Sequence, residues 1–136
     1  MLEEIAMKRV LILKIIGTLH TLAGLLLFSI ILISNDVAAT FFSLSPESVS
    51  IFKTPLTVVA SMNIGLGSLL IISSRIRDTH YAKFVLLGQV AMMFCILFGA
   101  LFNHFSSITA IDPPAPLWVM IILNLSFSLY GYFKGE

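Results

Sequence analysis

Charged residues are scarce in this chain, and none of its acids lies in an apolar stretch. Only 11% of the 136 residues are charged and 58% are hydrophobic, whereas soluble domains are about 25% charged. This composition predicts a membrane protein. The net charge of +1 offers no basic surface for nucleic acid, so we expect no nucleic-acid partner.

The seven Asp and Glu residues all fall in tails or connections. A carboxylate proton relay or a paired-carboxylate site inside a helical bundle would need an acid there, and a Ser-His-Asp site would need one beside its histidine. We therefore predict no catalytic residues. The sequence favours a protein that is not an enzyme, without deciding the matter.

Potential metal and haem ligands are also few. The single cysteine, Cys95, can form no intrachain disulfide. His20, His80 and His104 fall at different predicted depths, so they do not suit a metal site or a bis-histidine haem. We predict no metal and no cofactor, and a bound lipid or quinone stays open.

Four apolar segments are long enough to cross a bilayer, which takes about 20 helical residues. They cover residues 10–34, 55–73, 82–102 and 116–133. The first exceeds the 7–15 apolar residues of a signal peptide, so we expect it to be retained. The prediction is all-α, with residues 1–136 forming a single four-helix transmembrane domain. Ser45, Pro46 and Glu47 further predict a short interfacial helix over 46–53, since they suit a helix start.

Basic residues predict the orientation. All of them except Lys53 flank the first segment's start, the connection between segments 2 and 3, or the end of segment 4. The positive-inside rule therefore predicts that both termini face the cytoplasm, with the protein in the cell (inner) membrane.

Segments 2 and 4 begin alike. "PLTVVASMN" and "PLWVMIILN" share the proline, leucine and valine, and each reaches an asparagine, Asn63 or Asn124, eight residues after its proline. The match suggests two parallel helical hairpins, an arrangement known among transporters. Convergence on similar helix starts is the alternative.

Each predicted span carries one amide or imidazole side chain near the middle of the membrane: His20, Gln89, Asn63 and Asn124. In hydrocarbon such groups must find partners, so they should turn toward the bundle interior. Small or polar residues share a face with three of them, and small residues let helices approach closely. These neighbours are Gly17, Thr21 and Gly24 in segment 1, Ala60 and Gly67 in segment 2, and Ser128 and Gly131 in segment 4.

Segment 3 does not fit this pattern. Its small stripe, Gly88, Ala91, Cys95 and Gly99, points away from Gln89. Either Gln89 lines the interior and Ala91, Cys95 and Gly99 contact another helix or subunit, or the reverse holds.

Two interpretations of the polar residues stay open. They could simply bond one another and fix the helix register. Alternatively, they could line a pocket for the head of an amphipathic ligand, since ionisable groups at this depth are costly and often functional. The candidate ligand-binding residues are His20, Thr21, Asn63, Gln89, Asn124 and Ser128. The candidate packing or partner residues are Gly17, Gly24, Gly67, Ala91, Cys95 and Gly99.

The four spans, the longer first outer connection and the stretch "NIGLGSLLIISSRIR" resemble the DoxX-like group of small four-helix membrane proteins. The resemblance implies an accessory or assembly role in a larger membrane system, in some members linked to quinones, and it implies no particular site residues. We expect partners among membrane lipids, a larger membrane complex or a second copy. The sequence thus favours an accessory or assembly protein that binds lipid or quinone, with a small-molecule or lipid carrier or flippase, or a subunit of a quinone-linked oxidoreductase, as alternatives.

Overall fold

Five α-helices make up the structure, a computed structural model that describes residues 2–76, 78–105 and 114–134. They are α1 (Leu2–Ile33), α2 (Asn35–Phe42), α3 (Pro46–Ser73), α4 (Thr79–Phe105) and α5 (Ala115–Lys134). All except α2 are long and apolar enough to cross a membrane. The described residues contain no strand, and the predicted all-α fold with four spanning helices is confirmed.

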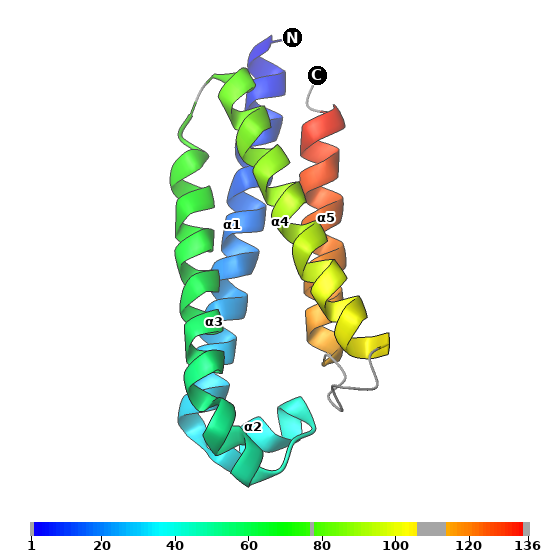
Figure 1. The fold of residues 1–136 in the computed structure, drawn as a ribbon. Helices are drawn as coiled ribbons and strands as arrows, with labels where there is room; N and C mark the ends of the chain where they lie inside the picture. The colour runs from blue at the N-terminus through cyan, green and yellow to red at the C-terminus, as the bar shows by residue number, and fades with distance from the viewer. Residues whose placement is uncertain (1, 77, 106–113, 135–136) are drawn as a thin grey trace.

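The spanning helices run alternately up and down (Figure 1). Both termini lie at one end, called here the N/C end, and α2 lies at the other, the α2 end. α1 contacts all four other helices, whereas the described parts of α3 and α5 do not touch. Toward the α2 end, α4 and α5 lean away from α1 and α3 (Figure 1). The bundle is therefore tighter at the N/C end.

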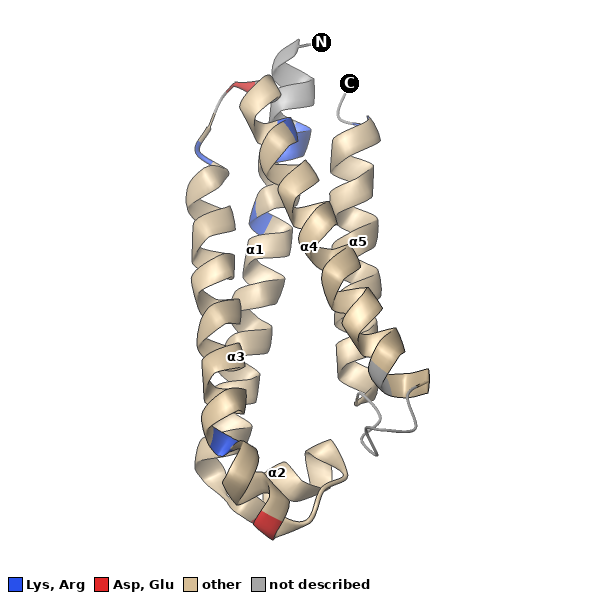
Figure 2. Ribbon diagram, viewed as in Figure 1, with Lys and Arg blue, Asp and Glu red and all other residues tan. Residues whose placement is uncertain are grey.

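The outer surface of the helices is apolar. Large side chains such as Met62, Phe98 and Ile122 are 68%, 73% and 60% exposed. Soluble monomers rarely expose so large an apolar surface, whereas such a surface suits contact with lipid acyl chains. The described Lys and Arg residues lie mainly toward the N/C end (Figure 2). Lys53 is the exception, because it belongs to the first turns of α3, which follow α2.

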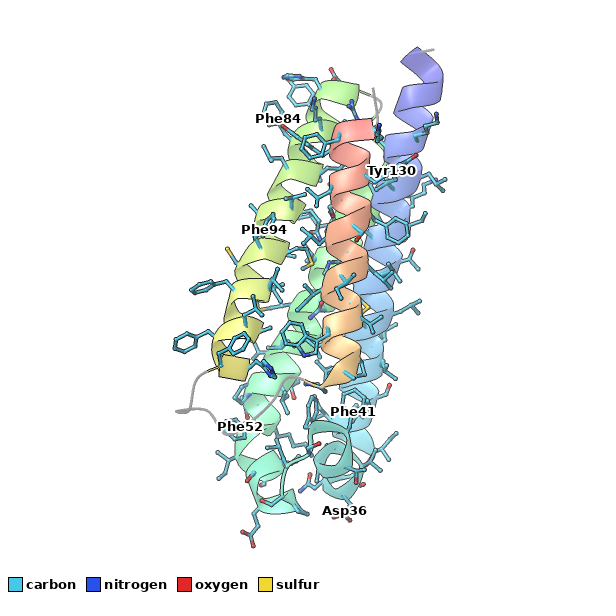
Figure 3. All side chains as sticks on the ribbon, turned by 90° about the vertical axis from the view of Figure 1, so that its right-hand side faces the viewer. Asp36, Phe41, Phe52, Phe84, Phe94 and Tyr130 are labelled. Carbon is cyan, nitrogen blue, oxygen red and sulfur yellow. The ribbon has the colours of Figure 1, made fainter. Side chains whose placement is uncertain are left out.

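Helix α2 was missing from the sequence prediction. The Ser34 hydroxyl caps it by accepting a hydrogen bond from the Val37 backbone at 3.1 Å. Ser43 ends it in the left-handed conformation, with φ 56°. In Figure 3, Phe41 lies on the side of α2 that faces the spanning helices, and Asp36 lies on the opposite side. Ala38 and Ala39 pack with Ile30 of α1 and Val49 of α3 in a small apolar cluster. This cluster holds α2 against the ends of those two helices.

The expected break at Pro55 is wrong. The predicted interfacial helix 46–53 and the predicted span 55–73 form one helix, α3, with Pro55 inside it. Ser45 does cap its start, as expected, by accepting from the Ser48 backbone at 3.2 Å. A proline inside a helix removes one hydrogen bond and crowds the carbonyl group four residues earlier, which usually kinks or breaks the helix. Pro55 is exposed and lies in the third turn of α3, and the helix nevertheless continues through it.

The proline-rich connection before α5 lies almost entirely outside the described residues. Pro116, which was predicted to open the last span, follows the first residue of α5.

Candidate functional site

A chain of hydrogen bonds joins three helices in the middle of the bundle. His20 Nδ1 of α1 lies 3.0 Å from Asn63 Oδ1 of α3. On the other side of the same ring, His20 Nε2 lies 2.7 Å from Gln89 Nε2 of α4. The sequence predicted that His20 and Asn63 face a common interior and left the orientation of Gln89 open, and the structure brings all three together.

The direction of each bond follows from the amides. Asn63 Nδ2 donates to the carbonyl oxygen of Val59 at 3.0 Å, so Asn63 Oδ1 is left as an acceptor. His20 must then donate from Nδ1, and its Nε2 accepts from Gln89. The chain therefore holds a neutral imidazole with its proton on Nδ1.

Asn124 lies at the same level on α5. Each of the four polar residues is about 13–18 Å along its helix from the N/C end of the span. The face of α5 that carries Asn124 also carries Gly131, where an added Cβ would meet Ile12 of α1 and Leu86 of α4. Asn124 is buried and so faces the region between these two helices. We call His20, Asn63, Gln89 and Asn124 the polar layer.

Two oxygens of the polar layer have no hydrogen-bond partner among the described residues, namely Gln89 Oε1 and Asn124 Oδ1. Both are fully enclosed, since Gln89 is 3% and Asn124 1% exposed. An unsatisfied buried acceptor costs about 1–3 kcal/mol. The polar layer is thus more than a set of mutually satisfied packing groups.

Two other candidate ligand residues bond within their own helices. Thr21 donates to the carbonyl oxygen of Gly17 at 2.9 Å, and Ser128 donates to that of Asn124 at 2.6 Å. Thr21 lies against α3, because a Cβ added at Gly67 would overlap its hydroxyl. Neither hydroxyl makes a described bond to another helix.

The candidate packing glycines lie where α1 and α3 meet. A Cβ added at Gly17 would come within 2.8 Å of the Gly67 carbonyl oxygen, and one at Gly24 within 2.7 Å of the Ala60 carbonyl oxygen. Only glycine permits this backbone approach, and it brings His20 within reach of Asn63.

On α4 the structure decides between the two orientations left open by the sequence. Gln89 faces the interior, and the stripe of Ala91, Cys95 and Gly99 is exposed on the outside. Among the described residues, the stripe is therefore not buried against another helix.

The bundle is packed on one side of the polar layer and more open on the other. Toward the N/C end, residues such as Leu13, Ile16 and Leu86 are fully buried. Toward the α2 end, parts of α3 and α5 become exposed, while Ile31 of α1 and Met93 and Ala100 of α4 stay buried. On α3, Leu66 packs against the core, but Val59, two turns further on the same face, is 47% exposed. On α5, Asn124 is buried, but Leu117, also two turns away, is 38% exposed.

Sequence reasoning missed Arg9. Its side chain is buried, and Nε donates to the Gly131 carbonyl oxygen at 3.4 Å. A cation suits the C-terminal end of α5, where carbonyl groups lack helical partners. The signal was in the sequence, because Arg9 precedes His20 by three helical turns and lies on the same face.

Comparison with known proteins identifies no relative. No protein-family model, curated protein or solved structure matches the chain. The resemblance to the DoxX-like group therefore stays a prediction, and the site has to be interpreted from its own geometry.

Proposed function

We propose that this protein is a small integral membrane protein that holds the polar head of a lipid or quinone at the polar layer. The observation that carries the proposal is the pair of enclosed, unpartnered oxygens beside the hydrogen-bonded chain of Asn63, His20 and Gln89. Packing alone gives no reason to bury such acceptors, whereas a bound head group would satisfy them.

The packing difference supports a ligand that enters from within the membrane. The tail of an amphipathic molecule would lie along the apolar, partly exposed residues between the polar layer and the α2 end, such as Val59 and Leu117. The tightly packed core at the N/C end would stop the head at the polar layer.

The role that fits this site best is that of an accessory or assembly protein in the inner membrane, with both termini in the cytoplasm. The basic residues toward the N/C end support this orientation. The exposed stripe of Ala91, Cys95 and Gly99 would provide the contact with a larger complex or a second copy, because small residues favour close helix packing in lipid.

A carrier or flippase is the second candidate, and the same packing difference favours it. A carrier must open its site to one side and then to the other, and a bundle closed at the N/C end and looser at the α2 end suits one of those states. The carrier predicts that aqueous reagents reach a cysteine placed at His20, whereas the binding protein predicts protection.

The test is identification of the molecules that stay bound to the purified full-length protein in mild detergent. We expect a stoichiometric lipid or quinone in the wild type and its loss in Asn63→Leu and His20→Leu. Ser126→Ala is the matched control, because Ser126 lies near the same depth but is exposed. If the folded variants and the wild type retain the same lipids in equal amounts, the proposal is wrong.

A further inference from the structure

The hydrogen-bonding groups of the polar layer show which kind of head group it can bind. The side chains of the polar layer and of Ser128 donate their described hydrogen bonds to acceptors of the protein itself. These acceptors are Val59 O, Asn63 Oδ1, His20 Nε2, Met120 O and Asn124 O. Each amide nitrogen has a second N–H, but the polar-layer atoms that make no described hydrogen bond at all are two oxygens, Gln89 Oε1 and Asn124 Oδ1. Only a hydrogen-bond donor can satisfy these two oxygens.

Asn63 shows how such an oxygen is satisfied. Asn63 and Asn124 each donate from Nδ2 to the carbonyl oxygen four residues earlier, at 3.0 and 2.8 Å. The amide oxygen of Asn63 then accepts the Nδ1 proton of His20. The amide oxygen of Asn124 is held in the same way by its own helix, but no described group donates to it.

Neither amide can simply turn around. Rotating the Gln89 amide would put its oxygen against His20 Nε2, which already acts as an acceptor, and two acceptors repel. Rotating Asn124 would set its oxygen against the Met120 carbonyl oxygen. Both unpartnered groups are therefore fixed as acceptors.

The absence of acids narrows the donor further. No Asp or Glu lies within ten residues of any member of the polar layer along the sequence. An ammonium group at this depth would have no counter-ion, and an unpaired charge in hydrocarbon is costly. A neutral donor carries no such penalty.

We propose that the polar layer selects a membrane-soluble molecule whose head is a neutral hydroxyl, which donates to Asn124 Oδ1 or Gln89 Oε1. This inference rests on the proposed binding of an amphipathic ligand and specifies its chemistry. A long-chain alcohol, a diacylglycerol or a reduced quinone carries such a group. A quinone in its oxidised form offers only acceptors and would leave both oxygens without a donor, so it should bind more weakly than the reduced form.

The probe is a hexadecanol that carries a photoreactive diazirine in its chain, and the control is the methyl ether of the same probe, which cannot donate. Both are added to the full-length protein in phosphatidylcholine nanodiscs, and the cross-linked residues are mapped by mass spectrometry. We expect the alcohol to label α3 and α5 between the polar layer and the α2 end about tenfold more than the ether, since one such bond in a dry site is worth about that factor. Asn124→Leu and Gln89→Met should reduce the ratio toward one, and Ser126→Ala should leave it unchanged.

Competition distinguishes the sources of the hydroxyl. Displacement of the probe by dioleoylglycerol would indicate a lipid, and displacement by decyl hydroquinone but not by the matching quinone would indicate a reduced quinone. Equal labelling by alcohol and ether at these positions would overturn the hydroxyl inference but keep amphiphile binding. Absence of labelling there by either probe would overturn the proposed function itself. If Asn124→Leu fails to fold, the alcohol-to-ether ratio of the wild type still decides.

Discussion

Asn63 and Asn124 make the same hydrogen bond to their own helices, at the same level, yet only Asn63 has a partner for its amide oxygen. Their helices, α3 and α5, do not touch in the described structure. The same amide oxygen therefore has two different surroundings. In Asn63 it accepts a hydrogen bond from His20, and in Asn124 it has no described donor. This difference separates a structural amide from a candidate binding amide.

The bond between His20 and Asn63 should be measurable as a coupling energy. A double-mutant cycle with His20→Leu and Asn63→Leu should give about 0.5–2 kcal/mol, the range for polar pairs between membrane helices. The measurement is unfolding by SDS in mixed micelles, followed by circular dichroism. The control cycle pairs His20→Leu with Ser68→Ala, because Ser68 bonds its own helix and is exposed. Equal coupling in the two cycles would contradict the bond.

Gly67 should not accept even one methyl group. An added Cβ would overlap Thr21 and the backbone of α1, so Gly67→Ala should lower stability by about 1–3 kcal/mol through forced separation of the helices. Gly65→Ala is the matched control on the same helix. Its Cβ would meet nothing within 4 Å, and alanine favours helix. SDS unfolding midpoints should therefore move in opposite directions, and a similar loss in both variants would rule out the close approach.

Replacing Arg9 should loosen the contact between α1 and α5. Arg9→Met removes a charge-assisted hydrogen bond to Gly131, and we expect a loss of about 1–3 kcal/mol in unfolding free energy. Lys14→Met is the comparison, since Lys14 is a cation on the same helix but exposed, and its loss should change stability by less than about 0.5 kcal/mol. Equal effects of the two changes would show that the buried guanidinium adds nothing.

Replacing Ser43 by glycine should stabilise the protein. It ends α2 with φ 56°, a conformation that costs a side-chain-bearing residue energy and glycine almost none. We expect Ser43→Gly to raise stability by about 0.5–1 kcal/mol. Ser50→Gly should do the reverse, because Ser50 is an exposed residue inside α3 where glycine weakens the helix. A thermal melt of each variant checks the two signs.

Thiol labelling should report both the lipid contact of α4 and the orientation. Cys95 is exposed on a membrane-spanning helix, where a water-soluble reagent does not enter, so an aqueous maleimide should not label it in intact cells. In a Cys95→Ala background, Ser50→Cys should be labelled from outside and Lys134→Cys only after lysis. Labelling of Lys134→Cys in intact cells would reverse the proposed orientation.

The sequence was sufficient to predict the four spans and the inward orientation of His20 and Asn63. Hydrophobic length defines the spans, and a lone imidazole or amide in hydrocarbon is costly, which brings these two residues together. Helical phase also placed Gly17, Gly24 and Gly67 on the faces that now touch. These predictions depend only on the length of apolar segments and on the spacing of residues along a helix, and both can be read directly from the sequence.

The remaining features depended on tertiary context. A proline suits the first turn of a helix, so the sequence predicts a helix start at Pro55, yet α3 continues through this residue despite the lost hydrogen bond. The sequence does not decide which face of α4 points inward. A stripe of small residues can pack inside the bundle or lie against lipid, so it does not determine where Gln89 points. The open acceptor of Asn124 is visible only once its neighbours are placed, since the identical local pattern around Asn63 leads to a satisfied bond.

The lean of α4 and α5 has a consequence for the bilayer. A body that is narrow at the N/C end and wide at the α2 end takes up more cross-sectional area in one leaflet than in the other (Figure 1). A wedge of this shape fits best where the leaflet at its wide end is the stretched, convex one. We therefore expect the protein to prefer membranes whose convex leaflet lies at the α2 end, with or without a ligand.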